Sequence, residues 1–201
     1  MRIEWLGHAC FLLTGRDGLR VVTDPFNEQV GYPVPRTKAD IVTVSHDHFD
    51  HNATQFVGGN PVIVRGTGDQ DAKNVRIKGI PTFHDKSQGR ERGPNTVYVI
   101  SLDGITVCHL GDLGHTLTED QLKTLGRVDV LLVPVGGTYT IDPEEAAEVV
   151  RQVNPVVAIP MHYKTRYLNF PIQPVEKFTS FFDNVRRGPY FEATPETLGA
   201  P

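Results

Sequence analysis

The chain of 201 residues has little of several features that mark particular classes of protein. It has only two cysteines, Cys10 and Cys108, and both lie inside apolar runs, so we expect buried free thiols rather than a disulfide framework. No apolar run approaches the roughly 20 residues of a membrane-spanning helix. The amino-terminal MRIEWLGHACFLL also lacks the small-residue cleavage site of a signal peptide. We therefore expect a cytoplasmic protein without a membrane partner.

The chain also lacks a large excess of charge of one sign. It has 24 acidic residues and 20 lysines and arginines, which give a net charge of −4. This balance gives no reason to expect a nucleic acid as a partner. The length predicts a single domain over residues 1–201, and the last roughly ten residues, which include ATPETLGAP, predict a loose tail. The apolar stretches VPVGG and LNFPI leave a homo-oligomer open.

Short β-rich runs separated by turn residues dominate the chain. Strands are predicted for RIEWLG, CFLLT, LRVVT, ADIVTVS, PVIV, VRIKGIPTF, TVYVISL, ITVCHL, DVLLVPV and VVAIPM. Helices are predicted over residues 119–126, after the capping-box pair Thr118 and Gln121, and from Asp142 to the residue before Pro155. An apolar stripe at helical spacing over residues 175–185 is predicted to face the core. The long loops at residues 25–38 and 85–95 are typical of functional lids.

Side chains that can bind a metal follow several of these apolar runs. The densest group is HDHFDH, residues 46–51, which holds three of the eight histidines of the chain. Five runs each end in such a side chain, and these residues are Asp24, His46, His84, Asp112 and His162. Strand ends along one edge of a sheet, or of two facing sheets, can converge on one rigid site. A solvated turn of fortuitous composition would not account for the partners at the other strand ends.

The spacing within residues 46–51 predicts two metal ions rather than one. His46 and His48 are two residues apart, so they project from the same side of an extended segment and can chelate one ion. Asp50 and His51 then turn toward a second ion, and imidazole with carboxylate suits a borderline cation such as zinc. Asp112 has two carboxylate oxygens with which to bridge the ions. Asp24 is either a direct ligand or a carboxylate that supports the ligands through hydrogen bonds.

These residues carry a resemblance to a known family. Residues 46–51 match the His-x-His-x-Asp-His pattern of the metallo-β-lactamase superfamily, and the order of the other metal-capable residues over about residues 1–165 is similar to it. WLGHACFLL, TDPF, GDLGH, LLVPVGGTYTIDPEEA and PMHYKT resemble its small metal-dependent hydrolases, which are similar to ascorbate-6-phosphate lactonase and N-acyl-phosphatidylethanolamine phospholipase D. The resemblance implies an α/β fold, the αββα sandwich, in which helices flank two mixed β-sheets and the site lies at one edge.

The resemblance also implies how the ligands are divided between two divalent ions. The first ion would take His46, His48 and His84, and the second would take Asp50, His51 and His162. Asp112 would bridge the two ions, and Asp24 would support the ligand loop. Zn²⁺ is the default metal, with Mn²⁺ and Fe²⁺ as alternatives.

The function implied by the resemblance is hydrolysis of an ester, lactone or similar acyl bond in a small substrate that can be anionic. A hydroxide held between the ions would attack, while Asp50 and Asp112 orient it and His115 protonates the leaving group. Three further residues are expected to support the site or touch the substrate: His8, Tyr163 and Lys164. The alternatives are a phosphodiesterase and a metal-binding sensor that catalyses nothing.

Overall fold

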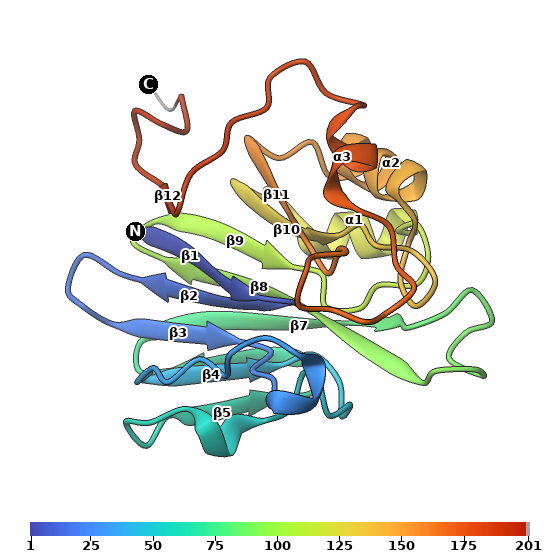
Figure 1. The fold of residues 1–201 in the computed structure, drawn as a ribbon. Coiled ribbons are helices and arrows are strands. Elements are labelled where there is room, and N and C mark those ends of the chain that lie inside the picture. The colour runs from blue at the N-terminus through green and yellow to red at the C-terminus, as the bar shows by residue number, and fades with distance from the viewer. Residues whose placement is uncertain (200–201) are drawn as a thin grey trace.

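Two six-stranded β-sheets pack face to face in the computed structural model, which describes residues 1–199 (Figure 1). The first sheet has the order β12-β1-β2-β3-β4-β5, and the second has the order β11-β10-β9-β8-β7-β6. The strands of the first sheet are β1 (Arg2–Gly7), β2 (Cys10–Thr14), β3 (Arg20–Thr23), β4 (Ile41–Val44), β5 (Val62–Arg65) and β12 (Phe191–Glu192). Those of the second are β6 (Gly68–Ala72), β7 (Val75–Phe83), β8 (Pro94–Leu102), β9 (Ile105–His109), β10 (Val130–Pro134) and β11 (Val157–Met161).

Alternation along the strands builds the core between the sheets. On β2, Phe11 and Leu13 face the second sheet, where they join a cluster that contains Ile77 and Ile100. The intervening Leu12 belongs to a separate cluster on the outer face of the first sheet. Removal of a side chain of this size from water contributes about 1.5–3 kcal/mol to the stability of the fold. Because side chains alternate between the two faces of a strand, the period of two in the sequence determines which face is buried.

Helices flank the sheets, as the resemblance to the metallo-β-lactamase superfamily implies. The three α-helices are α1 (Glu119–Leu125), α2 (Pro143–Val153) and α3 (Val175–Thr179), and they pack on the outer face of the second sheet (Figure 1). Capping boxes at Thr118 and Asp142 start α1 and α2, as predicted. The first sheet is covered by loops and by the 3₁₀ helix η1 (Glu28–Val30), while η2 (Thr54–Phe56) precedes β5.

Two predicted segments differ in the structure. The stripe at residues 175–185 forms only the five residues of α3, and Phe181 and Val185 are exposed, whereas Phe182 still packs against the core beside Phe178. The tail is not loose as far as residue 199. The backbone N–H of Ala193 donates to Met1 O at 2.9 Å next to β12, and Leu198 is buried in the core. Residues 200 and 201 lie outside the described part of the chain.

The strands that carry the predicted ligands run in a common direction within each sheet. In the first sheet β1 and β3 are both antiparallel to β2, and β3 is parallel to β4. In the second sheet β7 and β9 are both antiparallel to β8, and β9, β10 and β11 are parallel. The carboxyl ends of β1, β3, β4, β7, β9 and β11 therefore meet at one edge of the sandwich, where the metal-capable side chains follow them.

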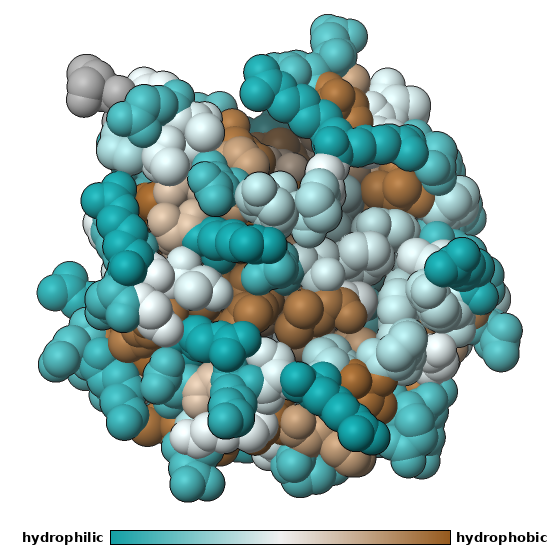
Figure 2. Space-filling view, turned by 60° about the vertical axis from the view of Figure 1, so that its left-hand side comes forward, coloured by the Kyte–Doolittle hydropathy of each residue, from teal (hydrophilic) through white to brown (hydrophobic). Residues whose placement is uncertain are grey.

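The surface is mixed in character. On the face that Figure 2 shows, hydrophobic residues are scattered among hydrophilic ones, which is ordinary for a folded domain. None of the helices formed by residues 1–199 has the length and apolar character needed to cross a membrane.

Candidate metal centre

The seven predicted ligands come together at this edge of the sandwich. All are buried except His48, which is exposed. Three residues at strand ends there, His8, Asp24 and His162, adopt left-handed backbone conformations with φ of 53°, 38° and 52°. Such conformations are costly for residues other than glycine and tend to occur at functional sites. Left-handed backbone therefore helps to place three of the side chains that meet at this edge, as it also shapes turns elsewhere in the chain.

One oxygen of Asp112 lies at the centre of the cluster. Its Oδ2 has four imidazole Nε2 atoms around it: those of His84 at 3.1 Å, His51 at 3.2 Å, His162 at 3.4 Å and His46 at 3.9 Å. Two ligand atoms that each lie about 2.1 Å from a tetrahedral ion are about 3.4 Å apart. The distances are therefore those expected between atoms that share a metal ion, and they connect Asp112 with histidines of both predicted ligand sets.

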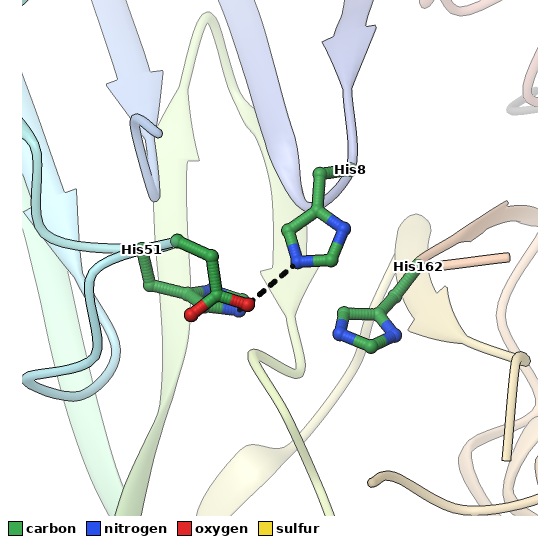
Figure 3. Close-up of side chains that lie close together, drawn as sticks. His8, His51 and His162 are labelled. Carbon is green, nitrogen blue, oxygen red and sulfur yellow. Dashed lines mark hydrogen bonds and ion pairs between the residues drawn. The ribbon is translucent and has the colours of Figure 1, made fainter. Parts of the chain in front are cut away.

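Within residues 1–199, three groups of side chains have the spacing of metal ligands, and one of them, Asp24 with His46 and His51, shares a histidine with each of the other two. The ligand atoms of His46, His48 and His84 all lie within 4.8 Å of one another, and these are the three residues predicted for the first ion. A second group with the same spacing contains His8 besides Asp50, His51 and His162. Figure 3 shows His8, His51 and His162 close together, and the ring centroid of His8 lies 4.2 Å from that of His162 and 5.2 Å from that of His51. The second group therefore has one residue more than the predicted ligand set.

Asp24 lies behind the cluster and supports it through hydrogen bonds. The backbone N–H of Ser45 donates to Asp24 Oδ1 at 2.8 Å, and Ser45 Oγ donates to Asp24 Oδ2. The same Oδ2 accepts from His51 Nδ1 at 2.8 Å, and Ser45 Oγ lies 2.9 Å from His46 Nδ1. With its proton on Nδ1, each imidazole presents an unprotonated Nε2 to the cluster.

Those two Nε2 atoms show that the residues fit a metal. Within residues 1–199, Nε2 of His46 and of His51 is buried and has no hydrogen-bond partner. A buried polar atom without a partner costs roughly 1–3 kcal/mol. Coordination to a divalent cation would remove this cost at both atoms, and imidazole and carboxylate are ligand types that zinc, manganese and iron accept.

The charges in the cluster also favour a cation. Asp24, Asp50 and Asp112 are buried, and among the described residues none of them pairs with a lysine or arginine. Burial opposes the charged form of His51, yet the carboxylates of Asp112 and Asp50 outweigh it and raise the pKa of His51 well above its ordinary value. At His46 burial, followed by the nearby His51, outweighs the carboxylates and lowers the pKa to about 3. Buried anions need a counter-charge, and a metal ion supplies it.

Two buried residues support the cluster although sequence reasoning missed them. Asn95 Oδ1 accepts the backbone N–H of Asp112 at 3.0 Å, and Asn95 Nδ2 donates to Leu110 O at 2.9 Å. Ser45 links Asp24 to His46, as described above. Ser45 stands directly before the histidine-rich segment, which is a weak signal, whereas nothing near Asn95 in the sequence marks it, because its partners are 15 and 17 residues away.

Three residues predicted to touch the substrate form other contacts. Both ring nitrogens of His115 are engaged with backbone, since Nδ1 donates to Thr116 O and Nε2 accepts from Phe83 N. Lys164 Nζ donates to two carbonyl oxygens of the loop at residues 168–170. Tyr163 stacks on Trp5 with ring centroids 4.9 Å apart. These contacts hold the protein's own loops and rings, and none of them is to a ligand of the cluster.

Comparison with known proteins places the site in a family context. Residues 2–162 match the family described as Beta-lactamase superfamily domain. A relative from Methanoculleus marisnigri, named UPF0173 metal-dependent hydrolase, is 34% identical over 190 residues, which cover 82% of this chain and 82% of that protein.

Solved structures show the same fold. A Thermotoga maritima protein assigned to the zinc-dependent hydrolases of the metallo-beta-lactamase superfamily is 48% identical, with a TM-score of 0.81 over 96% of this chain and 91% of that one. An isothiocyanate hydrolase from Delia radicum gut bacteria is 15% identical, with a TM-score of 0.68 over 90% and 91% of the two chains. At that identity the likeness concerns the fold alone.

Proposed function

This chain belongs to the beta-lactamase superfamily and to its metal-dependent hydrolases, and from that premise we propose that it uses two divalent ions to hydrolyse an ester, lactone or similar acyl bond of a small substrate. The observation that carries the proposal is the position of Asp112 Oδ2. It lies within 3.4 Å of Nε2 of His84, which belongs to the first ligand set, and of Nε2 of His51 and His162, which belong to the second. One carboxylate at that point can serve both ligand sets.

The residues would hold the ions in the two groups described above. His46, His48 and His84 would bind the first ion, Asp50, His51 and His162 the second, and Asp112 both. Zn²⁺ suits this set of nitrogen and oxygen ligands and is the metal to which the Thermotoga maritima relative is assigned. When bound, the ions would lower the pKa of a water molecule to roughly 7 and offset charge on the attacked group.

The protein's own groups would orient the reacting water. Asp112 Oδ1 is buried and, among the described residues, has no hydrogen-bond partner, so it can accept a hydrogen bond from the water. Asp50 is the second acceptor, because its carboxylate belongs to the same group of ligand atoms as His51 and His162. The water oxygen would bond to the acyl carbon, the acyl–oxygen bond would break, and the leaving alcohol would take a proton from solvent, since His115 is engaged with backbone.

Metal analysis and a substrate panel test the proposal. The purified protein is expected to carry two equivalents of metal and to hydrolyse 4-nitrophenyl esters or lactones. Dialysis against a chelator should abolish that activity, and Zn²⁺, Mn²⁺ or Fe²⁺ should restore it to different extents. One equivalent or none in the metal analysis would contradict the two-ion site. Hydrolysis of bis-4-nitrophenyl phosphate alone would favour the phosphodiesterase, and full metal occupancy without hydrolysis of any substrate would favour the sensor.

We assign His8 the role of positioning Asp50. His8 is fully buried, its Nε2 lies 3.0 Å from Asp50 Oδ2, and Trp5 Nε1 and the backbone N–H of His162 both donate to His8 O. Burial, followed by the nearby His162, lowers the pKa of His8 to about 4, so the ring is neutral at pH 7. A proton on Nε2 would then be donated to Asp50 and would direct its carboxylate toward the second ion.

A matched pair of substitutions at His8 tests this role. His8→Met removes the donor, whereas His8→Gln places an amide N–H near the position of Nε2 in a side chain of similar size. We expect His8→Met to weaken binding of the second ion by about 10- to 100-fold while the first ion stays bound, and His8→Gln to change it by only a few-fold. Calorimetric metal titration measures both. If both variants lose the same affinity for the second ion, His8 is itself a ligand of that ion. If neither variant loses affinity, His8 does not position Asp50.

A further inference from the structure

Two surface hollows open beside the ligands predicted for the first ion. One, of about 420 Å³, is lined by His46 and His48 and by two arginines, Arg65 and Arg92. The other, of about 290 Å³, is lined by His84 and Arg92 but also by Lys86 and four acids, Asp85, Glu91, Asp142 and Glu145, so the first hollow is the one that suits an anion. Arg92 therefore borders both hollows, and all three ligands of the first ion line one or the other. Hollows of this size suit a small molecule.

Neither arginine is tightly paired within the protein. Arg65 Nη1 lies 3.5 Å from Asp47 Oδ1, and Arg92 Nη1 lies 3.7 Å from Glu91 Oε2. Both distances exceed the roughly 2.7–2.9 Å of a charge-assisted hydrogen bond. The acids are themselves open to water, with 82% of the Asp47 side chain and 59% of the Glu91 side chain exposed. Ion pairs of this kind contribute little, so a ligand can replace them.

The backbone of Arg92 is held in a fixed place relative to the metal centre. Asp85, which follows the ligand His84 directly, is buried, and its Oδ2 accepts the backbone N–H of Arg92 at 2.8 Å. The same carboxylate accepts three further backbone N–H groups of this loop, those of Ser87, Gly89 and Glu91. The guanidinium carbon of Arg92 lies 5.6 Å from the ring centroid of Tyr139, which limits the side chain further.

We infer that Arg92, together with Arg65, forms a subsite for an anionic group of the substrate beside the first metal ion. The inference rests on the proposed hydrolase function and adds the substrate class: a small molecule that carries a carboxylate or a phosphate at one end and the scissile acyl bond at the other. A guanidinium recognises either anion through paired N–H donors. The anion would be held in the 420 Å³ hollow, which both arginines line, while the acyl bond lies over the metal centre.

A pair of esters that differ only at the far end tests the subsite. Mono-4-nitrophenyl adipate carries a carboxylate where 4-nitrophenyl hexanoate carries a methyl group. We expect Arg92→Gln and Arg65→Gln each to lower kcat/KM for the adipate ester about tenfold, mainly through KM, which corresponds to about 1.4 kcal/mol. The hexanoate ester should change by less than twofold. Arg90→Gln is the matched control, because Arg90 belongs to the same loop, is exposed and lines neither hollow.

Calorimetric titration of the metal-loaded protein with adipate, and separately with inorganic phosphate, gives a result that does not depend on turnover. A tenfold weaker Kd in Arg92→Gln and Arg65→Gln, but not in Arg90→Gln, would support the subsite, and the anion with the larger change is the group that it recognises. The inference is overturned if two quantities of the variants stay within twofold of those of the unmodified chain. These are the ratio of kcat/KM for the adipate ester to kcat/KM for the hexanoate ester, and the Kd for the anion. A chain that cleaves neither ester contradicts acyl hydrolysis, and the titration alone then decides on the subsite.

Discussion

Asp112→Asn is expected to remove the two-ion site while the fold remains intact. The amide keeps the shape of the carboxylate but loses its charge and one of its two oxygens, so it cannot bridge two cations. Without the bridge, the Nε2 atoms of His84, His51 and His162, all within 3.4 Å of Asp112 Oδ2, lose their common anionic partner. We expect at most one equivalent of bound metal and a loss of kcat/KM on the order of 1000-fold or more, which is about 4 kcal/mol of transition-state stabilisation.

Metal analysis by mass spectrometry and the ester assay measure this result. Asp129→Asn is the matched control, because Asp129 is also a buried acid with a backbone donor, Thr106 N at 2.8 Å, but lies outside both ligand groups. It should leave metal content and kcat/KM unchanged. Two bound equivalents in the Asp112→Asn protein, with kcat/KM within tenfold of the unmodified chain, would disprove the bridging role.

Gly111→Ala is expected to destabilise the fold more than any surface substitution. Gly111 has φ of 57°, and a Cβ atom there would clash with Asn95 Oδ1 and would lie 2.7 Å from Ser45 Cβ. Neither neighbour can move freely, because Asn95 accepts the N–H of Asp112 and Ser45 donates to Asp24. Overpacking costs about 1–3 kcal/mol and the left-handed backbone about 1–2 kcal/mol, so we expect a loss of about 2–5 kcal/mol.

Thermal unfolding of the metal-free protein checks this expectation, since each kcal/mol shifts Tm by about 2–4 °C in a chain of this size. Gly104→Ala separates the two costs. Gly104 also has a left-handed backbone, with φ of 77°, but a Cβ there would meet no heavy atom within 4 Å. The Gly104→Ala protein should therefore lose only the roughly 1–2 kcal/mol of stability that a left-handed backbone costs. If both variants lose the same stability, crowding around Gly111 does not constrain the site.

The sequence predicts the parts of the fold whose cause is local. The strand β2 and the start of α2 follow from alternation and from the Asp142 capping box, and both were confirmed. β6 could not be found this way, because Gly68–Ala72 reads GDQDA and has no apolar alternation. It is an edge strand held by β7, and its turn uses left-handed Lys73 and Asn74. Pairing with a neighbour, rather than intrinsic preference, makes this segment a strand.

At the candidate site, too, some features follow from the local sequence and others depend on tertiary placement. The pattern of residues 46–51 and the order of the strand ends predict which side chains meet, and the structure brings all seven together. The support given by Asn95 and the loop contacts of His115 and Lys164 depend on tertiary placement. The strand end and nearby carbonyl groups determine the direction of a lysine or histidine side chain next to a ligand, so proximity in sequence alone does not determine what it contacts.

The two sheets contribute different members of the proposed first ligand group, so metal binding there would link metal supply to the lifetime of the protein. His46 and His48 follow β4 of the first sheet, whereas His84 follows β7 of the second, so the first ion would cross-link the halves of the sandwich. Any opening that separates the sheets must then release the ion. By mass action, each hundredfold excess of free metal over its Kd adds about 2.7 kcal/mol against such opening. In a metal-poor cell the same chain would open more often and be exposed to proteases for longer.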